Sequence, residues 1–176
     1  MAPRVVFSSD DISRSLKRIA HEIIESLPDA RNVLVLGIPT RGVSLAKRLT
    51  DLLIALNPGF DVRFGVLDVT MYRDDQVNPD RPITETQLPA SGLDNEIVIL
   101  VDDVLYSGRT IRAALDALVD YGRPKQVKLA VVVDRGHREL PIRPDFVGKN
   151  LPTSSQERVS VKLVEHDGVD EVVIES

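Results

Sequence analysis

Four short apolar runs, each separated from the next by a helical or loop-forming segment, constrain the fold of this chain most. Runs of this length that are mostly apolar, without regular alternation of polar residues, are typical of strands buried on both faces of a parallel sheet. Such a sheet needs helices on both sides to cover it. The sequence therefore predicts an α/β fold with a mostly parallel twisted sheet flanked by helices, and with strands at residues 33–36, 62–69, 97–101 and 127–133.

Amphipathic segments beside these runs predict the covering helices. The first begins at Ser8, where two serines and two aspartates supply capping hydroxyls and early negative charge. Apolar residues from Ile12 to Leu27 then recur at helical spacing, and Pro28 ends the helix. Two more helices are expected, from Gly42 to about Leu56 and from Thr110 to Asp120.

Two other regions are expected to differ from this pattern. Residues 72–94 contain three prolines and little apolar periodicity, which predicts a long loop with room for a hairpin. Long loops of this kind are often lids or binding loops. Near the end of the chain, residues 159–164 and 171–174 are expected to form strands that pair as a hairpin around Asp167 and Gly168.

Composition limits the class of protein. The 176 residues suit one domain spanning residues 1–176, and the lack of cysteine excludes disulfides, thiolate zinc sites and cysteine nucleophiles. No apolar run approaches the roughly 20 residues of a membrane helix, and the N-terminus lacks the apolar core of a signal peptide. We therefore expect a cytoplasmic protein without a membrane partner. Its net charge of -5 means that any nucleic acid must bind at a local basic patch.

The segment after the third apolar run carries the clearest chemistry. Ligands of parallel sheets bind beyond the carboxyl ends of the strands, and here that position holds the adjacent acids Asp102 and Asp103. Neighbouring carboxylates repel each other unless a cation or hydroxyl donors meet them. Ser107, Gly108 and Thr110 follow at a helix start, where free backbone N–H groups bind anions and glycine permits close approach. Acids suited to sugar hydroxyls or Mg²⁺, followed by a phosphate cradle, fit a phosphorylated sugar.

This segment also carries a resemblance to known proteins. Residues 98–110, VILVDDVLYSGRT, resemble the signature with which type I phosphoribosyltransferases bind 5-phosphoribosyl-1-pyrophosphate (PRPP). Five further segments resemble, in order, the PyrR family of pyrimidine-operon regulators with uracil phosphoribosyltransferase activity. The most specific of these is VDRGHRELPIR at residues 133–143. The others are RIAHE (18–22), GIPTRG (37–42), YRDD (72–75) and GKNLPTS (148–154).

The resemblance implies a type I phosphoribosyltransferase fold with a small hood, and it implies roles for particular residues. Asp102 and Asp103 would hold the ribose hydroxyls of PRPP, and Arg73 is expected to reach its pyrophosphate from the long loop. The cofactor is expected to be Mg²⁺, bound mainly through PRPP with the two acids nearby, because this ion prefers oxygen ligands and substrate phosphates. No residue is assigned as a general base. The residues expected to bind PRPP or UMP are Thr40, Arg41, Gly42, Asp102, Asp103, Val104, Leu105, Tyr106, Ser107, Gly108, Arg109, Thr110, Arg135 and Val159.

A second role, in binding RNA, is implied for a basic surface. The family binds messenger RNA of pyrimidine genes with an affinity set by uridine nucleotides such as UMP and UTP, and it forms homodimers or higher homo-oligomers. The charge pattern of the first helix by itself favours a solvated face whose cations pair with Glu22 and Glu25. The resemblance shifts the interpretation toward RNA, with contacts at Lys17, Arg18, His21, Arg138, Arg143 and Lys149.

Two alternative functions stay open at this point. One is a phosphoribosyltransferase for another base, such as a purine or orotate. The other is a nucleotide-sensing RNA-binding regulator with weak catalysis. A P-loop or dinucleotide-binding protein is set aside because the glycine-rich motifs of those classes are absent. A metal hydrolase is disfavoured because His21, His137 and His166 do not form a ligand pattern.

Overall fold

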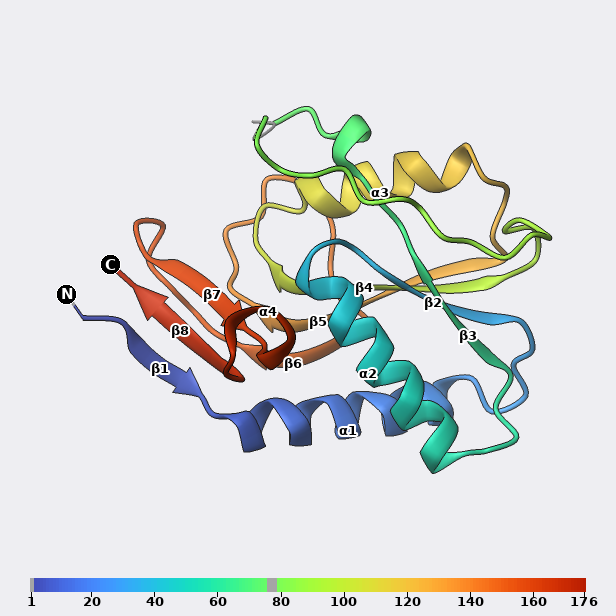
Figure 1. Ribbon diagram of the computed structural model, residues 1–176, viewed down its shortest axis with the longest axis horizontal. Helices are drawn as coiled ribbons and strands as arrows, with labels where there is room; N and C mark the ends of the chain where they lie inside the picture. The colour runs from blue at the N-terminus through green and yellow to red at the C-terminus, as the bar shows by residue number, and fades with distance from the viewer. Residues whose placement is uncertain (1, 76–78) are drawn as a thin grey trace.

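The computed structural model describes residues 2–75 and 79–176 and confirms the predicted α/β architecture (Figure 1). Its central sheet has the strand order β3-β2-β4-β5-β6 and is parallel throughout. α1 and α2 pack on one face of this sheet and α3 packs on the other. The strands are β2 (Val33–Gly37), β3 (Val62–Val66), β4 (Ile97–Leu105), β5 (Gln126–Asp134) and β6 (Phe146–Asn150), and the helices are α1 (Ser9–Ser26), α2 (Arg41–Leu56) and α3 (Arg109–Val119).

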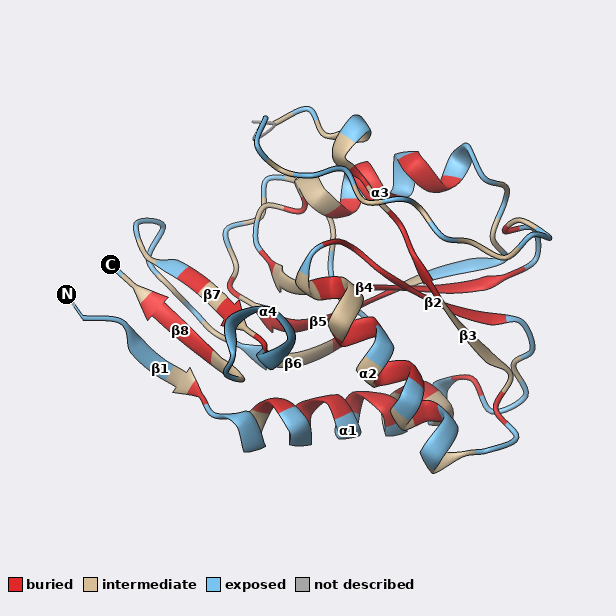
Figure 2. Cartoon of the chain, viewed as in Figure 1, coloured by how far each residue is buried: buried red, intermediate tan, exposed pale blue. Residues whose placement is uncertain are grey.

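The continuous apolar runs are explained by burial on both faces of the sheet. Successive side chains of a strand point to opposite faces. In β2, Val33 and Val35 therefore pack in the core cluster of α1 and α2, whereas Leu34 and Leu36 pack in the cluster of α3. Figure 2 shows the same contrast in space, with central strands buried along most of their length and the outer side of α1 exposed.

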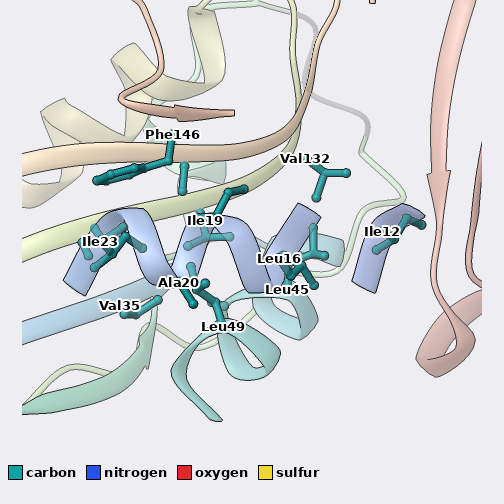
Figure 3. Close-up of a cluster of buried hydrophobic side chains, with 14 of the residues drawn as sticks. Ile12, Leu16, Ile19, Ala20, Ile23, Val35, Leu45, Leu49, Val132 and Phe146 are labelled. Atoms are coloured by element: carbon teal, nitrogen blue, oxygen red, sulfur yellow. The ribbon is translucent and has the colours of Figure 1, made fainter. Parts of the chain in front are cut away.

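The larger core cluster lies between α1, α2 and the sheet. In Figure 3, Leu16, Ile19 and Ile23 of α1 lie in the same cluster as Leu45 and Leu49 of α2. Each of these side chains is buried, and burying a side chain of this size is worth about 1.5–3 kcal/mol. The helical spacing of the apolar residues in α1 is thus the pattern that places this helix on the sheet.

The predicted start of α1 is confirmed by a reciprocal cap. The backbone N–H of Asp11 donates to Ser8 Oγ at 3.2 Å, and the N–H of Ser8 donates to Asp11 Oδ2 at 2.9 Å. Two amides that a helix end leaves without partners are satisfied in this way. The first and last residues of α2 and α3 agree with the sequence prediction to within one residue.

A small antiparallel sheet, the hood, stands beyond the carboxyl ends of β4 and β5 (Figure 1). The expected pairing of the last two strands is confirmed, but a short helix, α4, connects them instead of a tight turn. The N-terminal strand was not predicted, because its few apolar residues show no clear period. In order across the hood, the strands are β1 (Arg4–Phe7), β8 (Glu171–Glu175) and β7 (Arg158–Lys162), and α4 is Val164–Asp167.

The predicted ends of two strands need correction. β3 ends at Val66 rather than at residue 69, and a 3-10 turn, η1 (Thr70–Tyr72), follows. The carboxylate of Asp68 accepts the N–H of Thr70 at 2.8 Å and so directs the chain out of the sheet. β4 continues four residues beyond Val101, because it pairs with β5 as far as Leu105.

Edge strand β6 was not predicted, since its second half is polar and exposed. In the expected loop at residues 72–94, Gln87 forms an isolated antiparallel bridge with Val66 of β3, and the described part of the loop contains no hairpin of two strands. Residues 76–78 of this loop lie outside the described part of the chain. Within the described residues, no helix is long and apolar enough to cross a bilayer.

The topology brings the ends of β2 and β4 together. The chain passes from β2 outward to β3 and then returns to β4 on the other side of β2, so the strand order reverses between these two strands. Gly37 pairs with Val101, and the N–H of Ile38 donates to the Val101 carbonyl at 3.0 Å. Ligands of open α/β sheets bind at such a reversal, beyond the carboxyl ends of the strands.

Candidate active site

The two acids lie in the last part of β4, and they differ in burial. The side chain of Asp102 is buried, with 8% exposure of the residue, whereas Asp103 is half-buried. The N–H of Asp103 donates to Asp102 Oδ1 at 2.9 Å, and the N–H of Val104 donates to Asp103 Oδ1 at 2.8 Å. Burial raises the pKa of Asp102 well above its usual value, and the neighbouring charge of Asp103 raises it further. A cation or hydroxyl donors at this point would relieve that cost.

The start of α3 forms the second half of the site. Gly108 has a φ of 94°, a conformation that favours glycine, and α3 begins after it without a side-chain cap. The N–H of Arg109 donates to Ser107 Oγ at a long 3.3 Å, and the first backbone bond of the helix is made by Arg112 to Gly108. The amides of the first turn therefore present their N–H groups at a helix N-terminus, as an anion site requires.

Asp102 and the helix start line one cavity of about 300 Å³, whereas Asp103, the next residue of β4, does not line it. Arg73 reaches it from the loop after β3, and its Nη1 donates to Thr110 Oγ1 at 2.9 Å. The same guanidinium is held by Asp75 through bonds of 2.8 and 2.6 Å. Other predicted site residues that line this cavity are Asp102, Val104, Leu105, Tyr106, Ser107, Gly108 and Arg109.

The predicted pyrophosphate loop lies at the junction of β2 and α2. Thr40 is exposed, and Arg41 is the first residue of α2. Gly42 is buried, and a Cβ atom there would lie 2.6 Å from the carbonyl oxygen of Val101. Glycine is thus required for the helix to approach β4, a packing reason that the sequence alone did not indicate. The guanidinium of Arg41 forms two hydrogen bonds with Asp167 of the hood.

A second cavity of about 380 Å³ lies beyond the end of β5. Arg135 lines it with only 7% exposure, and its guanidinium donates to Thr153 Oγ1 at 3.1 Å and to the Ser154 carbonyl at 3.0 Å. The same guanidinium lies 4.2 Å from the ring centroid of Tyr106, which lines the first cavity. Arg135 and Tyr106 therefore connect the two cavities. Val159 lines neither, because this residue of hood strand β7 is buried in the larger core cluster.

Three of the residues expected to bind RNA share the exposed side of α1. Lys17 and His21 lie on that side with Arg18, which also anchors an edge of the sheet. The guanidinium of Arg18 donates to the carbonyls of Val147 and Gly148 in β6, at 3.2 and 2.7 Å, and pairs with Glu22.

The other three predicted RNA residues lie in or near β6. Lys149 is exposed, and its Nζ lies 4.9 Å from the ring of Phe7. Arg143 is exposed in the segment before β6. Arg138 differs, because its guanidinium donates to the carbonyls of Tyr106 and Ile142 and pairs with Asp134. Arg138 thus holds the turn after β4 against the end of β5.

Three acids around the site were not identified from the sequence. Asp75 holds Arg73, Glu139 pairs with Arg109 at 2.6 Å, and Asp167 holds Arg41. Asp75 and Glu139 stand inside the YRDD and VDRGHRELPIR segments, so the resemblance marked their neighbourhood. Asp167 had no such signal, because it comes 126 residues after the arginine that it contacts.

Comparisons with known proteins decide the family. Residues 8–165 match the model of the phosphoribosyl transferase domain. The bifunctional protein PyrR of Mycobacterium tuberculosis is 56% identical over 179 residues, which cover 97% of this chain and 92% of that protein. The bifunctional protein PyrR of Streptomyces coelicolor is 58% identical over 172 residues, which cover 97% and 89%. The chain belongs to the PyrR family.

Solved structures support the fold of this PyrR-family chain. A hypoxanthine phosphoribosyltransferase of Trypanosoma cruzi, in a ternary complex with substrates, matches with a TM-score of 0.76 at 16% identity, covering 98% of this chain and 94% of that one. A hypoxanthine phosphoribosyltransferase of Staphylococcus aureus matches with a TM-score of 0.67 at 17% identity, covering 86% and 79%. At these identities the likeness concerns the fold alone. The predicted fold and the predicted PyrR membership are both confirmed.

Proposed function

We propose that this PyrR-family chain transfers the phosphoribosyl group of PRPP to uracil, giving UMP and pyrophosphate, and regulates pyrimidine genes by binding their messenger RNA. The observation that carries the enzymatic part is the cavity that Asp102 of β4 shares with the N-terminus of α3. The cavity combines a carboxylate that can accept hydrogen bonds from sugar hydroxyls with backbone N–H donors for a phosphate, and Asp103 follows directly in the chain. A ribose 5-phosphate is the ligand that uses both.

The residues of the site act mainly by orientation and charge. Asp102 and Asp103 accept hydrogen bonds from the ribose hydroxyls and fix the sugar. The amides from Tyr106 to Thr110 hold the 5-phosphate. Arg41 and Arg73 stabilise the charge that grows on pyrophosphate as its bond to the ribose breaks. Exclusion of water then favours attack by a uracil nitrogen on the oxocarbenium-like ribose, and the proton of that nitrogen leaves late, to solvent.

The residues present fit a Mg²⁺ ion bound together with PRPP. Within residues 2–75 and 79–176, no group of three or more acidic or histidine side chains forms a metal site. The buried Asp102 beside Asp103 instead supplies two carboxylates whose mutual repulsion a cation would relieve. Such a partial ligand set suits an ion that takes most of its ligands from substrate phosphates and water. When bound, Mg²⁺ supplies positive charge that stabilises the departing pyrophosphate.

The cavity beyond β5 is the proposed place for the base. Uracil carries two carbonyls and two N–H groups, which backbone groups and the buried Arg135 can match. Arg135 lies against the ring of Tyr106, so a base bound here would lie next to the phosphoribosyl cavity. No side chain is assigned as a general base. Val159 would influence this region only through the core on which the hood rests.

The proposed RNA surface is the exposed side of α1 together with the adjoining strand β6. Arg18 joins the two elements, and Lys17, His21 and Lys149 are exposed beside it. Phosphate contacts dominate RNA affinity, so a basic surface of this kind is suited to a polyanion even though the whole chain is acidic. A homo-oligomer would place several such surfaces in one particle.

The decisive experiment is UMP formation from uracil, PRPP and Mg²⁺ by the purified protein, with hypoxanthine, guanine and orotate in parallel. Selective formation of UMP is the expected result. Product with a purine or with orotate would instead assign the enzyme to another base. No product with any base would leave a nucleotide-sensing regulator, and binding of pyrimidine-gene RNA with and without UMP would then test that function directly.

A further inference from the structure

The hood contacts the start of α2 through an arginine of the pyrophosphate loop. Arg41 Nε donates to Asp167 Oδ2 at 3.1 Å, and Arg41 Nη2 donates to Asp167 Oδ1 at 2.7 Å. This is a two-bond pair between planar groups, which fixes the orientation of the guanidinium as well as its position. Both side chains are partly exposed, at 33% and 21%, so the pair lies at the surface of the site rather than in the core.

Asp167 is itself held in place from two sides. Its Oδ2 also accepts the N–H of Leu163 at 2.9 Å, across the short helix α4. One turn along α2, Ser44 Oγ lies 2.8 Å from His166 Nε2. A further turn along, Arg48 pairs with Asp170. Arg41, Ser44 and Arg48 recur at spacings of three and four, so a single side of α2 faces the hood.

The pairing leaves part of Arg41 available. Its Nε and Nη2 edge faces Asp167, and the Nη1 end is not used in that pair. The neighbouring Gly42 packs on the backbone of β4, where an added Cβ atom would lie 2.6 Å from the Val101 carbonyl oxygen and 3.4 Å from Asp102 Cα, so Arg41 begins α2 beside the acids. The bonds to Asp167 raise the pKa of Arg41, and the charge of Asp103 adds to this shift. Arg41 therefore lies between a carboxylate of the hood and the proposed PRPP site.

We propose that Asp167 is a positioning residue, which holds Arg41 so that the Nη1 end of its guanidinium, the end not paired with Asp167, faces the pyrophosphate of PRPP. This inference rests on the proposed function, because it takes Arg41 as a pyrophosphate contact. It gives the hood a part in binding the leaving group. A carboxylate that binds one edge of an arginine reduces the side-chain freedom that the arginine would otherwise lose on binding its ligand.

The test is binding of PRPP with Mg²⁺ by calorimetry, together with steady-state kinetics of UMP formation, on the full chain. We expect Asp167→Asn to weaken PRPP binding and raise the KM for PRPP by about five- to tenfold, as for removal of one charge-assisted hydrogen bond. The KM for uracil should change less than twofold or so. The melting temperature should change little, because partly exposed ion pairs contribute little to stability.

Two variants control for effects of the hood as a whole. Asp170→Asn weakens the contact of the hood with Arg48 without touching Arg41, and Asp51→Asn removes an exposed acid of α2 that pairs with Lys47. Neither should raise the KM for PRPP. If Asp170→Asn raises it as much as Asp167→Asn, docking of the hood is what matters and the positioning role is wrong.

The arginine itself separates this inference from the proposed function. If Arg41→Ala leaves PRPP binding unchanged, the assignment of Arg41 to pyrophosphate fails. If Arg41→Ala weakens binding but Asp167→Asn does not, the positioning role alone fails. With both assignments correct, Arg41→Ala combined with Asp167→Asn should lose no more affinity than Arg41→Ala, since the two residues act through one contact.

Discussion

The carboxyl edge of the sheet and the exposed side of α1 both carry arginines and acids, but they arrange them differently. At the sheet edge, two ion pairs join separate elements: Arg109 of α3 meets Glu139 of the loop after β5, and Arg41 of α2 meets Asp167 of the hood. On α1 the pairs are local, as for Arg18 with Glu22 one turn later.

The difference indicates two kinds of ligand. Charges fixed by several elements have a defined geometry, which suits a small ligand with fixed distances between its phosphates and hydroxyls. Charges along one exposed helix are screened by salt, and such a surface is tolerant of the shape of its partner. A polyanion such as RNA can use a surface of this kind, whereas a catalytic site cannot.

The largest expected effect separates the two regions completely. Asp102→Asn combined with Asp103→Asn should reduce UMP formation by at least about a hundredfold, because the ribose hydroxyls and Mg²⁺ lose both negatively charged carboxylates. RNA affinity should stay within about twofold of the parent, since the α1 surface is unchanged. Turnover assays and RNA titrations on the same preparation measure both. Unchanged turnover would show that the acids of β4 are not the site.

Charge reversal on α1 should give the opposite result. Lys17→Glu combined with Arg18→Glu is expected to weaken RNA binding by about tenfold or more. The slope of the logarithm of the binding constant against the logarithm of the salt concentration should become shallower by about one unit for each phosphate that the variant no longer neutralises. Catalysis should be spared. Lys47→Glu, an exposed lysine of α2, is the matched control. Equal RNA affinity in the double variant and the parent would refute the role of this surface.

A smaller effect concerns the folding stability that is lost because the carboxylate of Asp102 is buried at the sheet edge. In the folded protein the pKa of Asp102 is raised above the unfolded value of 3.8 by burial and by Asp103. At pH values below 3.8, Asp102 is protonated in both the folded and the unfolded state, so burying it costs no folding free energy for an ionised carboxylate. As the pH rises through the interval up to the folded pKa, the unfolded state releases its proton first, so folding stability falls.

Asp102→Asn should remove this penalty. At neutral pH, without Mg²⁺ or PRPP, we expect the variant to be more stable by about 0.5–2 kcal/mol, as is common where an active-site group is relieved. Near pH 3.5 or so the difference should vanish. Urea unfolding at both pH values measures it. A variant less stable than the parent at neutral pH would mean that the carboxylate is compensated in the free protein.

The smallest effect tests whether α1 is only a charged surface. Arg18→Met should cost about 0.5–1.5 kcal/mol of stability, because the carbonyls of Val147 and Gly148 in β6 lose their donor. Lys17→Met, one residue away and exposed, should change stability by less than about 0.5 kcal/mol. Thermal unfolding of the two variants makes the comparison. Equal effects would mean that Arg18 does not anchor β6.

Much of this protein was determined by the sequence alone, because the responsible signals are short-range. Residues 98–110 contain a buried strand, two acids and a helix start in one continuous segment, so the local geometry follows from the order of residues. The apolar runs likewise determine a parallel sheet, since only helices on both faces cover such strands. The helix of Ile12 to Leu27 needed only its own spacing and the cap at Ser8.

Other features were decided only by the tertiary structure, because they depend on which segments become neighbours. β4 extends to Leu105 because β5 lies beside it, and polar β6 is a strand because the sheet offers it an edge. The requirement for glycine at position 42 comes from the carbonyl of Val101 in another strand. The pair of Arg41 and Asp167 exists because the hood folds back over α2, a contact that no local pattern specifies.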